Sequence, residues 1–124
     1  MNETAGCACG GAPKLIFACS GAADVGAVAD QTARKLTKDG IGKMYCTAGI
    51  GGRISGILAT TESAARILAI DGCPLNCVKC SLEQAGFTAF EHLQLADLGM
   101  AKGQTPPTPE AVSRAAAAAA AKLV

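Results

Sequence analysis

Residues 67–77 have the sequence ILAIDGCPLNC, in which an apolar run ends at an Asp-Gly-Cys turn. The first five residues have the length and composition of a buried β-strand. Pro74 suits the first position of a following helix, because its missing backbone N–H would have no partner there in any case. The apolar side of that helix would consist of residues at helical spacing: Leu75, Val78, Leu82 and Ala85. This stretch therefore predicts a strand followed by a helix.

The same alternation of strand and helix patterns occurs along most of the chain. Apolar residues at helical spacing between Val25 and Leu36 predict an amphipathic helix, with Gly40 just beyond its end. The Gly-rich segment 48–53 is expected to be a loop before a short helix over residues 54–60. Apolar runs predict four strands, over residues 14–19, 43–46, 67–71 and 89–95. We expect a single-domain α/β fold, with an open parallel sheet of about four strands and helices on both faces.

Composition changes at both ends of this predicted domain. Residues 1–13 are small, polar and Gly-rich, and are expected to form a flexible arm. Residues 14–103 would form the α/β domain itself. Residues 104–124 comprise a Pro-rich linker and an Ala-rich helix of high helix propensity, with Thr108 as its N-terminal cap.

Length, charge and composition exclude several classes of protein. The chain has 124 residues, which suits one domain, and a formal net charge of +1. Aromatic residues make up 3% of the chain, so the stacking platforms of a nucleic-acid binder are missing. The low net charge means that a basic binding surface is missing as well. No apolar run approaches the length that spans a bilayer, and the first residues do not resemble a secretory signal. We expect a cytoplasmic protein that binds neither nucleic acid nor membrane, and the sequence leaves its oligomeric state open.

Seven cysteines are many for a chain of this length. The odd number and the absence of a signal pattern argue against a framework of disulfides. In a reducing compartment, cysteines at such density are more often metal ligands or redox groups.

Four of these cysteines, Cys19, Cys46, Cys73 and Cys77, lie where predicted strands end or where the next helix begins. The carboxyl ends of parallel strands meet at one edge of a sheet, and ligands bind there in open α/β folds. Four converging thiolates are the ligand set of a tetrahedral zinc site, so we expect Zn²⁺ at this edge. Helix N-termini and Arg53 would offset the negative charge of such a site.

Other interpretations of the same cysteines stay open at this stage. A helix N-terminus lowers thiol pKa values, so Cys73 or Cys46 could serve a thiol-based redox or sulfur-transfer enzyme without metal. Four cysteines also suit an iron–sulfur cluster. Cysteines are common buried residues too, although four at strand ends exceed what simple packing explains. We expect metal binding rather than catalysis.

The remaining candidate ligands are weaker. Cys80 follows Cys77 at a C-x2-C spacing but lies further into the predicted helix, and Cys7 and Cys9 form a C-x-C pair on the arm. His92 is the single histidine and is expected to be a half-exposed strand residue.

The loop after Cys46 has some features of an anion-binding loop. Arg53 follows with six intervening residues, whereas the phosphate loop of cysteine phosphatases has five, so that mechanism is discounted. Helix-start amides near Gly51, Gly52 and Arg53 are still expected to suit a small anion.

Three motifs occur in order along the chain: Ala18-Cys19-Ser20-Gly21, Cys46-x2-Gly49-Ile50-Gly51-Gly52-Arg53 and Asp71-Gly72-Cys73-Pro74-Leu75-x-Cys77. Together they resemble the DGC-domain family, a group of small bacterial and archaeal proteins named for their Asp-Gly-Cys motif. The resemblance extends from about Lys14 to Gly103. It implies that Cys19, Cys46, Cys73 and Cys77 are the family cysteines assigned to zinc, and that Asp24 is the family's acidic residue after the first cysteine. The resemblance and the residues themselves favour a zinc-binding protein that handles or senses metal.

Overall fold

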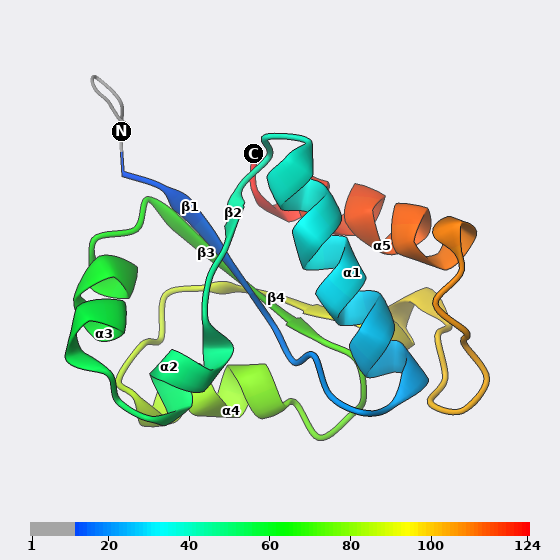
Figure 1. Cartoon of the computed structure of the whole chain (residues 1–124), viewed down its shortest axis with the longest axis horizontal. Helices are drawn as coiled ribbons and strands as arrows, with labels where there is room; N and C mark the ends of the chain where they lie inside the picture. The colour runs from blue at the N-terminus through cyan, green and yellow to red at the C-terminus, as the bar shows by residue number, and fades with distance from the viewer. Residues whose placement is uncertain (1–11) are drawn as a thin grey trace.

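A computed structural model describes residues 12–124 and contains one four-stranded sheet, with the strand order β2-β1-β3-β4. All three strand pairs are parallel, which confirms the predicted α/β fold (Figure 1). The strands are β1 Lys14–Ala18, β2 Lys43–Met44, β3 Arg66–Asp71 and β4 Glu91–Gln94.

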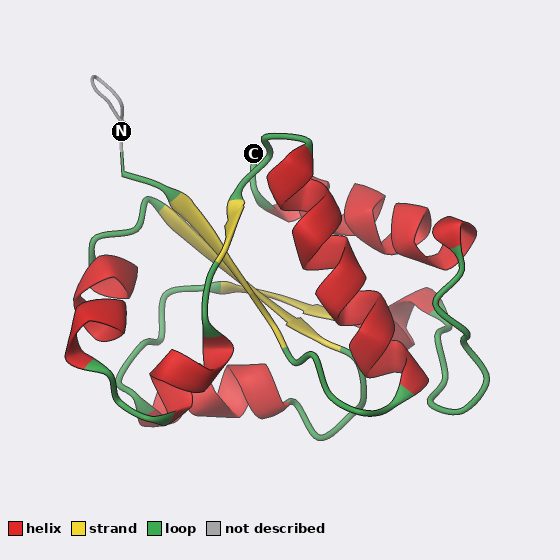
Figure 2. Cartoon of the chain, in the orientation of Figure 1, coloured by secondary structure: helices red, strands yellow, loops and turns green. Residues whose placement is uncertain are grey.

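Helices cover both faces of the sheet (Figure 2). Helices α1 and α5 pack on one face, while α2, α3 and α4 lie on the other (Figure 1). A 3₁₀ helix, η1, follows β4 directly. The helix bounds are α1 Asp24–Lys38, α2 Thr47–Gly51, α3 Ser55–Glu62, α4 Cys77–Gln84, η1 Leu95–Leu98 and α5 Pro109–Lys122.

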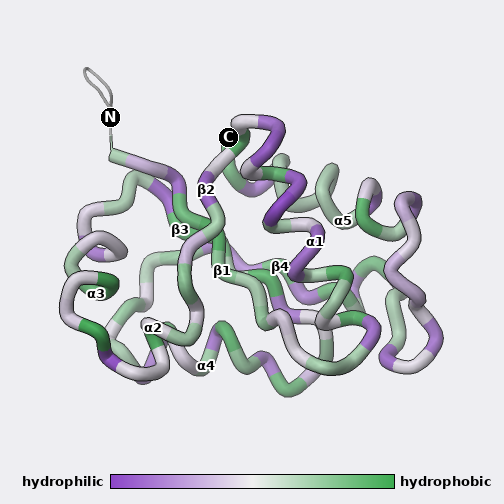
Figure 3. The backbone as a smooth tube through the Cα atoms, viewed as in Figure 1, coloured by the Kyte–Doolittle hydropathy of each residue, from purple (hydrophilic) through white to green (hydrophobic). Residues whose placement is uncertain are grey.

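The two faces arise from the alternation of side chains along the buried strands. Ile16 and Ile70 point toward α1 and α5, whereas Leu15, Phe17 and Ala69 belong to the cluster on the opposite face. Figure 3 shows the resulting pattern, with hydrophobic strands at the centre and hydrophilic stretches along α1. Two separate apolar clusters, one on each face, therefore support the sheet.

Two helix boundaries differ from the sequence-based expectation. The segment predicted as a Gly-rich loop forms the one-turn helix α2, because this turn places Ile50 fully in the core. Gly49 makes that packing possible, since a Cβ atom there would lie 2.8 Å from Cγ1 of Ile57. The second prediction that was wrong is a helix start at Pro74, because α4 begins at Cys77.

The sheet topology defines one special position. Strand β1 lies between β2 and β3, so the chain leaves β1 in one direction and returns on its other side. The switch point, where open α/β folds bind ligands, therefore falls between the carboxyl ends of β1 and β3. Within residues 12–124, no helix has the length and apolar character needed to cross a membrane.

Candidate thiol site at the sheet switch point

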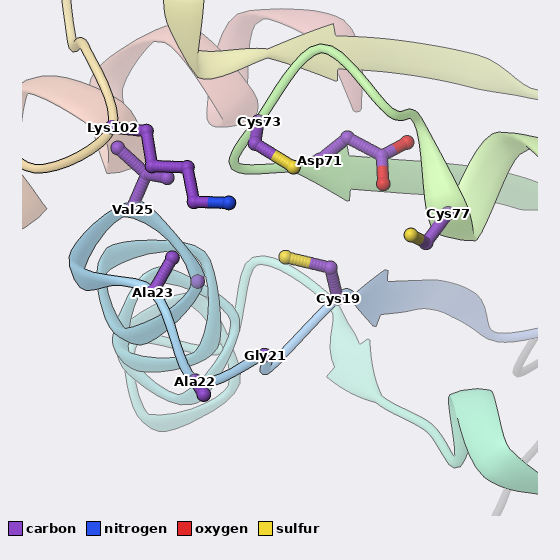
Figure 4. A pocket seen from close by; sticks show the side chains of 10 residues that line it. Cys19, Gly21, Ala22, Ala23, Val25, Asp71, Cys73, Cys77 and Lys102 are labelled. Carbon is purple, nitrogen blue, oxygen red and sulfur yellow. The ribbon is translucent and has the colours of Figure 1, made fainter.

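A pocket of about 430 Å³ lies at this switch point. It is lined by Cys19, on the loop after β1, by Cys73, on the connection after β3, and by Cys77, at the start of α4. Figure 4 shows the sulfur atoms of the three residues directed toward a shared space. The structure thus brings together three of the four cysteines predicted from the sequence.

Close backbone contacts hold the two thiol-bearing loops against α1. A Cβ atom at Gly72 would lie 2.5 Å from the carbonyl oxygen of Val25, and one at Gly26 would lie 2.6 Å from that of Gly21. Real Cβ atoms do not approach backbone this closely, so both positions require glycine. The Asp-Gly-Cys motif therefore includes its glycine because the loop after β3 rests directly on the first turn of α1.

Asp71 explains why α4 starts at Cys77. Its side chain is 1% exposed, and its two carboxylate oxygens accept hydrogen bonds from the backbone N–H groups of Val78 at 2.8 Å and Lys79 at 3.1 Å. These are N–H groups that the first turn of a helix leaves unpaired. The capping carboxylate thus comes from the end of β3, and residues 74–76 are free to form a turn, with Asn76 in the left-handed region at φ 56°.

Strand β4 supports the same connection from the other side. Gln94 donates from Nε2 to the carbonyl oxygen of Cys73 at 2.8 Å and to Oδ1 of Asn76 at 2.6 Å. His92, on the same strand, places Nε2 2.8 Å from Oδ2 of Asp71. Cys73 and Cys77 are therefore held on a connection that is fixed from three directions.

Electrostatics at the site disfavour ionisation of Cys77. Desolvation raises the pKa of the Cys77 thiol even though the residue is exposed overall, and negative charge on Cys73, Asp71, Cys19 and Cys80 raises this pKa further. The sulfur atoms are thus near enough to repel one another when ionised. Such repulsion is what a bound cation would relieve.

Cys46 occupies a different position from the other three. It is exposed and lines a neighbouring pocket of about 500 Å³, into which Cys19 also extends. The connection that carries it is tied to β1 by the Thr47 hydroxyl, which donates to the carbonyl oxygen of Ala18 at 2.9 Å. Cys19 consequently lies between Cys46 on one side and the Cys73 and Cys77 pair on the other.

The remaining predicted residues lie outside the pocket. Cys80 is exposed on α4 and does not line it. Arg53 donates from its guanidinium to the carbonyl oxygens of Ile50 at 2.8 Å and Gly51 at 3.3 Å, so its charge lies at the end of α2. Cys7 and Cys9 lie outside the described residues. Within the described range, no group of three or more His, Cys, Asp or Glu side chains stands in an arrangement ready to hold a metal ion.

Sequence reasoning gave no role to three residues that shape the site. Asp71 was recognised only as part of a motif, although an acidic residue at a strand end before a helix is a possible signal for a distant cap. His92 meets Asp71 through the register of β3 and β4, which pairs Ala69 with His92. Lys102 lines the pocket from a loop far along the chain, and no local pattern indicates that placement.

The fold and site define a small α/β protein with a cysteine cluster at the switch point of a parallel sheet. The family model of the DGC domain matches residues 15–119, and the chain belongs to this family. A relative is the "Anaerobic and virulence modulator AnvM" of Pseudomonas aeruginosa, which is 38% identical over 88 residues, or 71% of this chain and 67% of the relative. No solved structure matches the chain.

Proposed function

We propose that this protein handles or senses a soft metal ion, zinc in the first instance, and that Cys19, Cys73 and Cys77 bind it with Cys46 as the fourth ligand. The observation that carries this proposal is the convergence of three thiols, from two separate loops, on one pocket at the switch point. Thiolates are preferred zinc ligands, and four around one ion complete the usual tetrahedral set.

The charge distribution supports a cation in the pocket. Desolvation raises the pKa of Cys77, and repulsion from Cys73, Asp71 and Cys19 raises it further. A divalent ion there would stabilise all of these groups in their ionised forms. The same shift disfavours Cys77 as a resting thiolate nucleophile, because reactive thiols have lowered rather than raised pKa values.

The arrangement favours a metal that exchanges over a structural one. Two apolar clusters already fill the space between the sheet and its helices, with residues such as Leu15, Ile16 and Phe17 fully buried. A core of this kind folds without a metal staple. Cys46, exposed in the adjoining pocket, is placed to bind the ion before or after the other three. The name of the relative describes a modulator, and this supports a regulatory role over a purely structural one.

A thiol-based redox or sulfur-transfer enzyme that uses Cys73 or Cys46 is the second candidate. The observation in its favour is that the pocket beside the thiols is large enough for a small substrate and contains an amine, that of Lys102. A closed four-thiolate zinc site would leave no open coordination position on the metal for such a substrate.

Zinc stoichiometry and competition with a chelator test the proposal. Wild-type protein, purified without a tag and reduced, should bind one zinc ion per chain and release it reversibly to a chelator while its circular dichroism stays constant. Cys73→Ser should bind zinc much more weakly, and Cys80→Ser is the matched control, because Cys80 lies on α4 outside the pocket. Complete unfolding on chelation would show a structural zinc. Turnover of a disulfide or persulfide by metal-free protein, abolished in Cys73→Ser, would favour the enzyme.

A further inference from the structure

Lys102 contributes a positive charge to the thiol pocket. Figure 4 shows its side chain reaching over Val25, with the ammonium group directed toward the sulfur atoms of Cys19 and Cys73. Lys102 lies on the loop between η1 and α5, so a third segment of the chain completes the pocket. Among the described residues it forms no ion pair.

Asp24 fixes the loop that carries this lysine. Its carboxylate accepts hydrogen bonds from the backbone N–H of Gly103 and that of Thr105, both at 2.8 Å, across 79 and 81 positions of sequence. These bonds, that from Gly103 foremost, lower the pKa of Asp24, so the carboxylate stays ionised and the loop stays attached near neutral pH. The acidic residue that follows the first cysteine thereby holds Lys102 beside the thiols.

Asp71, the carboxylate that lines the pocket, does not pair with this ammonium. Its two oxygens are held by the backbone N–H groups of Val78 and Lys79 and by His92. A small anion that enters the pocket therefore meets an available positive charge at Lys102.

The remaining walls are apolar and small. Ala22, Ala23 and Val25 line the side next to α1, and the pocket volume of about 430 Å³ lies within the range of small-molecule sites. The lining has a single ammonium, which balances the one negative charge of a carboxylate and leaves a phosphate dianion with a charge unbalanced. The chemistry of the pocket is thus one cation, a short apolar wall and a group of thiols.

We propose that this pocket binds a small organic carboxylate, with its negative charge on Lys102 and its short apolar body between the alanines and the sulfur atoms of Cys19 and Cys73. The ligand class deepens the proposed function, since such a molecule would lie directly over the thiols that are proposed to bind metal. It does not depend on the metal, because Lys102 and the alanines take no part in the proposed metal binding.

Paired alkylating reagents test this in the metal-free, reduced protein. Iodoacetate and iodoacetamide differ in one group, a carboxylate or its neutral amide. In both cases the thiolate sulfur bonds to the CH₂ carbon and iodide leaves. The ratio of the two rates at each cysteine, measured by peptide mass spectrometry, cancels differences in thiol reactivity. Cys80, outside the pocket, is the internal reference.

We expect the ratio of iodoacetate to iodoacetamide rates at Cys19 and Cys73 to exceed that at Cys80 by about fivefold, as suits one partly exposed charge pair. In Lys102→Met the ratio at Cys19 and Cys73 should fall to the Cys80 value, and in Lys102→Arg it should stay high. Added salt should lower the ratio in the wild-type protein. Propionate should slow modification by iodoacetate more than an equal concentration of inorganic phosphate. Equal ratios at Cys19, Cys73 and Cys80 in wild-type protein would overturn the inference, as would a ratio unchanged in Lys102→Met.

The outcome is distinguishable from that of the metal proposal. A chain that binds zinc but shows no carboxylate preference keeps the proposed function and loses this inference. A chain that shows the carboxylate preference but binds no zinc keeps this inference and loses the proposed function. Stronger protection by phosphate than by propionate would overturn the assignment to carboxylates.

Discussion

Two connections between a strand and a helix carry cysteines to the same edge of the sheet, and they are built very differently. The connection after β3 leaves a six-residue, almost fully buried strand and is held by Asp71, Gln94 and the close approach of Gly72. The connection after β2 leaves a two-residue strand at the edge of the sheet and ends in an exposed Cys46. The interior connection therefore presents a fixed pair of thiols, whereas the edge connection presents one accessible thiol.

This difference indicates a division of roles among the cysteines. Cys73 and Cys77 would determine whether the metal binds at all, because their geometry is fixed before it arrives. Cys46 would contribute less to affinity and more to the entry and exit of the ion. Cys19 lines both pockets and is thus common to the two parts of the site.

The largest effect is expected from removing the carboxylate that holds the interior connection. Asp71→Ala leaves two helix N–H groups without their charged acceptor, at a position that is 1% exposed. We expect the free energy of unfolding to fall by about 3 kcal/mol. Urea denaturation measures this, with Asp97→Ala on the exposed side of η1 as the control. An unchanged midpoint for Asp71→Ala would show that α4 does not depend on this cap.

The next prediction compares the two connections directly. Cys73→Ser should lower zinc affinity about a hundredfold, which is about 2.8 kcal/mol, and Cys46→Ser only about tenfold. Competition with a chromophoric chelator measures both. Rapid mixing should show in addition that Cys46→Ser slows zinc uptake. A larger loss of affinity in Cys46→Ser than in Cys73→Ser would reverse the comparison and place the main site at the sheet edge.

Gly72→Ala sharpens the comparison without touching a thiol. Its new Cβ atom would lie 2.5 Å from the Val25 carbonyl oxygen, so the loop after β3 must move away from α1. We expect a loss of about 2 kcal/mol of stability, measured by thermal or urea unfolding, together with weaker zinc binding. Gly21→Ala is the matched control on the facing loop, because a Cβ atom there meets nothing within 4 Å. Equal stability of the two variants would contradict the close packing described.

The smallest effect concerns acid stability and Asp24. Hydrogen bonds from Gly103 and Thr105 lower its pKa in the folded protein, so folding gains stability from this group above its unfolded pKa, near 3.9. That stability is lost as the pH falls through the folded pKa. As the pH is lowered from 5, the free energy of unfolding should therefore fall less steeply in Asp24→Asn than in the wild type. Denaturation followed by circular dichroism at each pH measures this. Identical pH profiles would argue against the attachment of the Lys102 loop by Asp24.

The sequence predicts the framework of this molecule well, because strands and helices follow from local periodicity. The amphipathic helix α1 and the buried strand β3 are two such cases, and Thr108 does cap α5 by accepting from the N–H of Ala111 at 3.1 Å. The start of α4 is not predictable in the same way, since its cap comes from Asp71 at the end of β3. The glycines of residues 48–53 predict a loop, although part of this segment forms the helical turn that buries Ile50.

The site is only partly readable from the sequence for the same reason. Cysteines at the ends of β1 and β3 converge because parallel strands share an edge, and that follows from topology. Cys46 lies apart from the other three cysteines because β2 is short. It pairs with β1 at only two positions, Lys43 and Met44. The placement of Lys102 depends on bonds between Asp24 and a loop 79 positions away, a contact that no sequence pattern indicates.

X-ray absorption at the zinc edge tests the central claim most directly, which is that thiols from the loops after β1 and β3 bind one metal ion. The zinc-loaded protein should show sulfur neighbours at about 2.3 Å, the usual zinc–thiolate distance. Their number should fall by one in each of Cys19→Ser, Cys73→Ser and Cys77→Ser, and stay constant in Cys80→Ser. A spectrum with only nitrogen and oxygen neighbours, or one that changes in Cys80→Ser alone, would contradict the account.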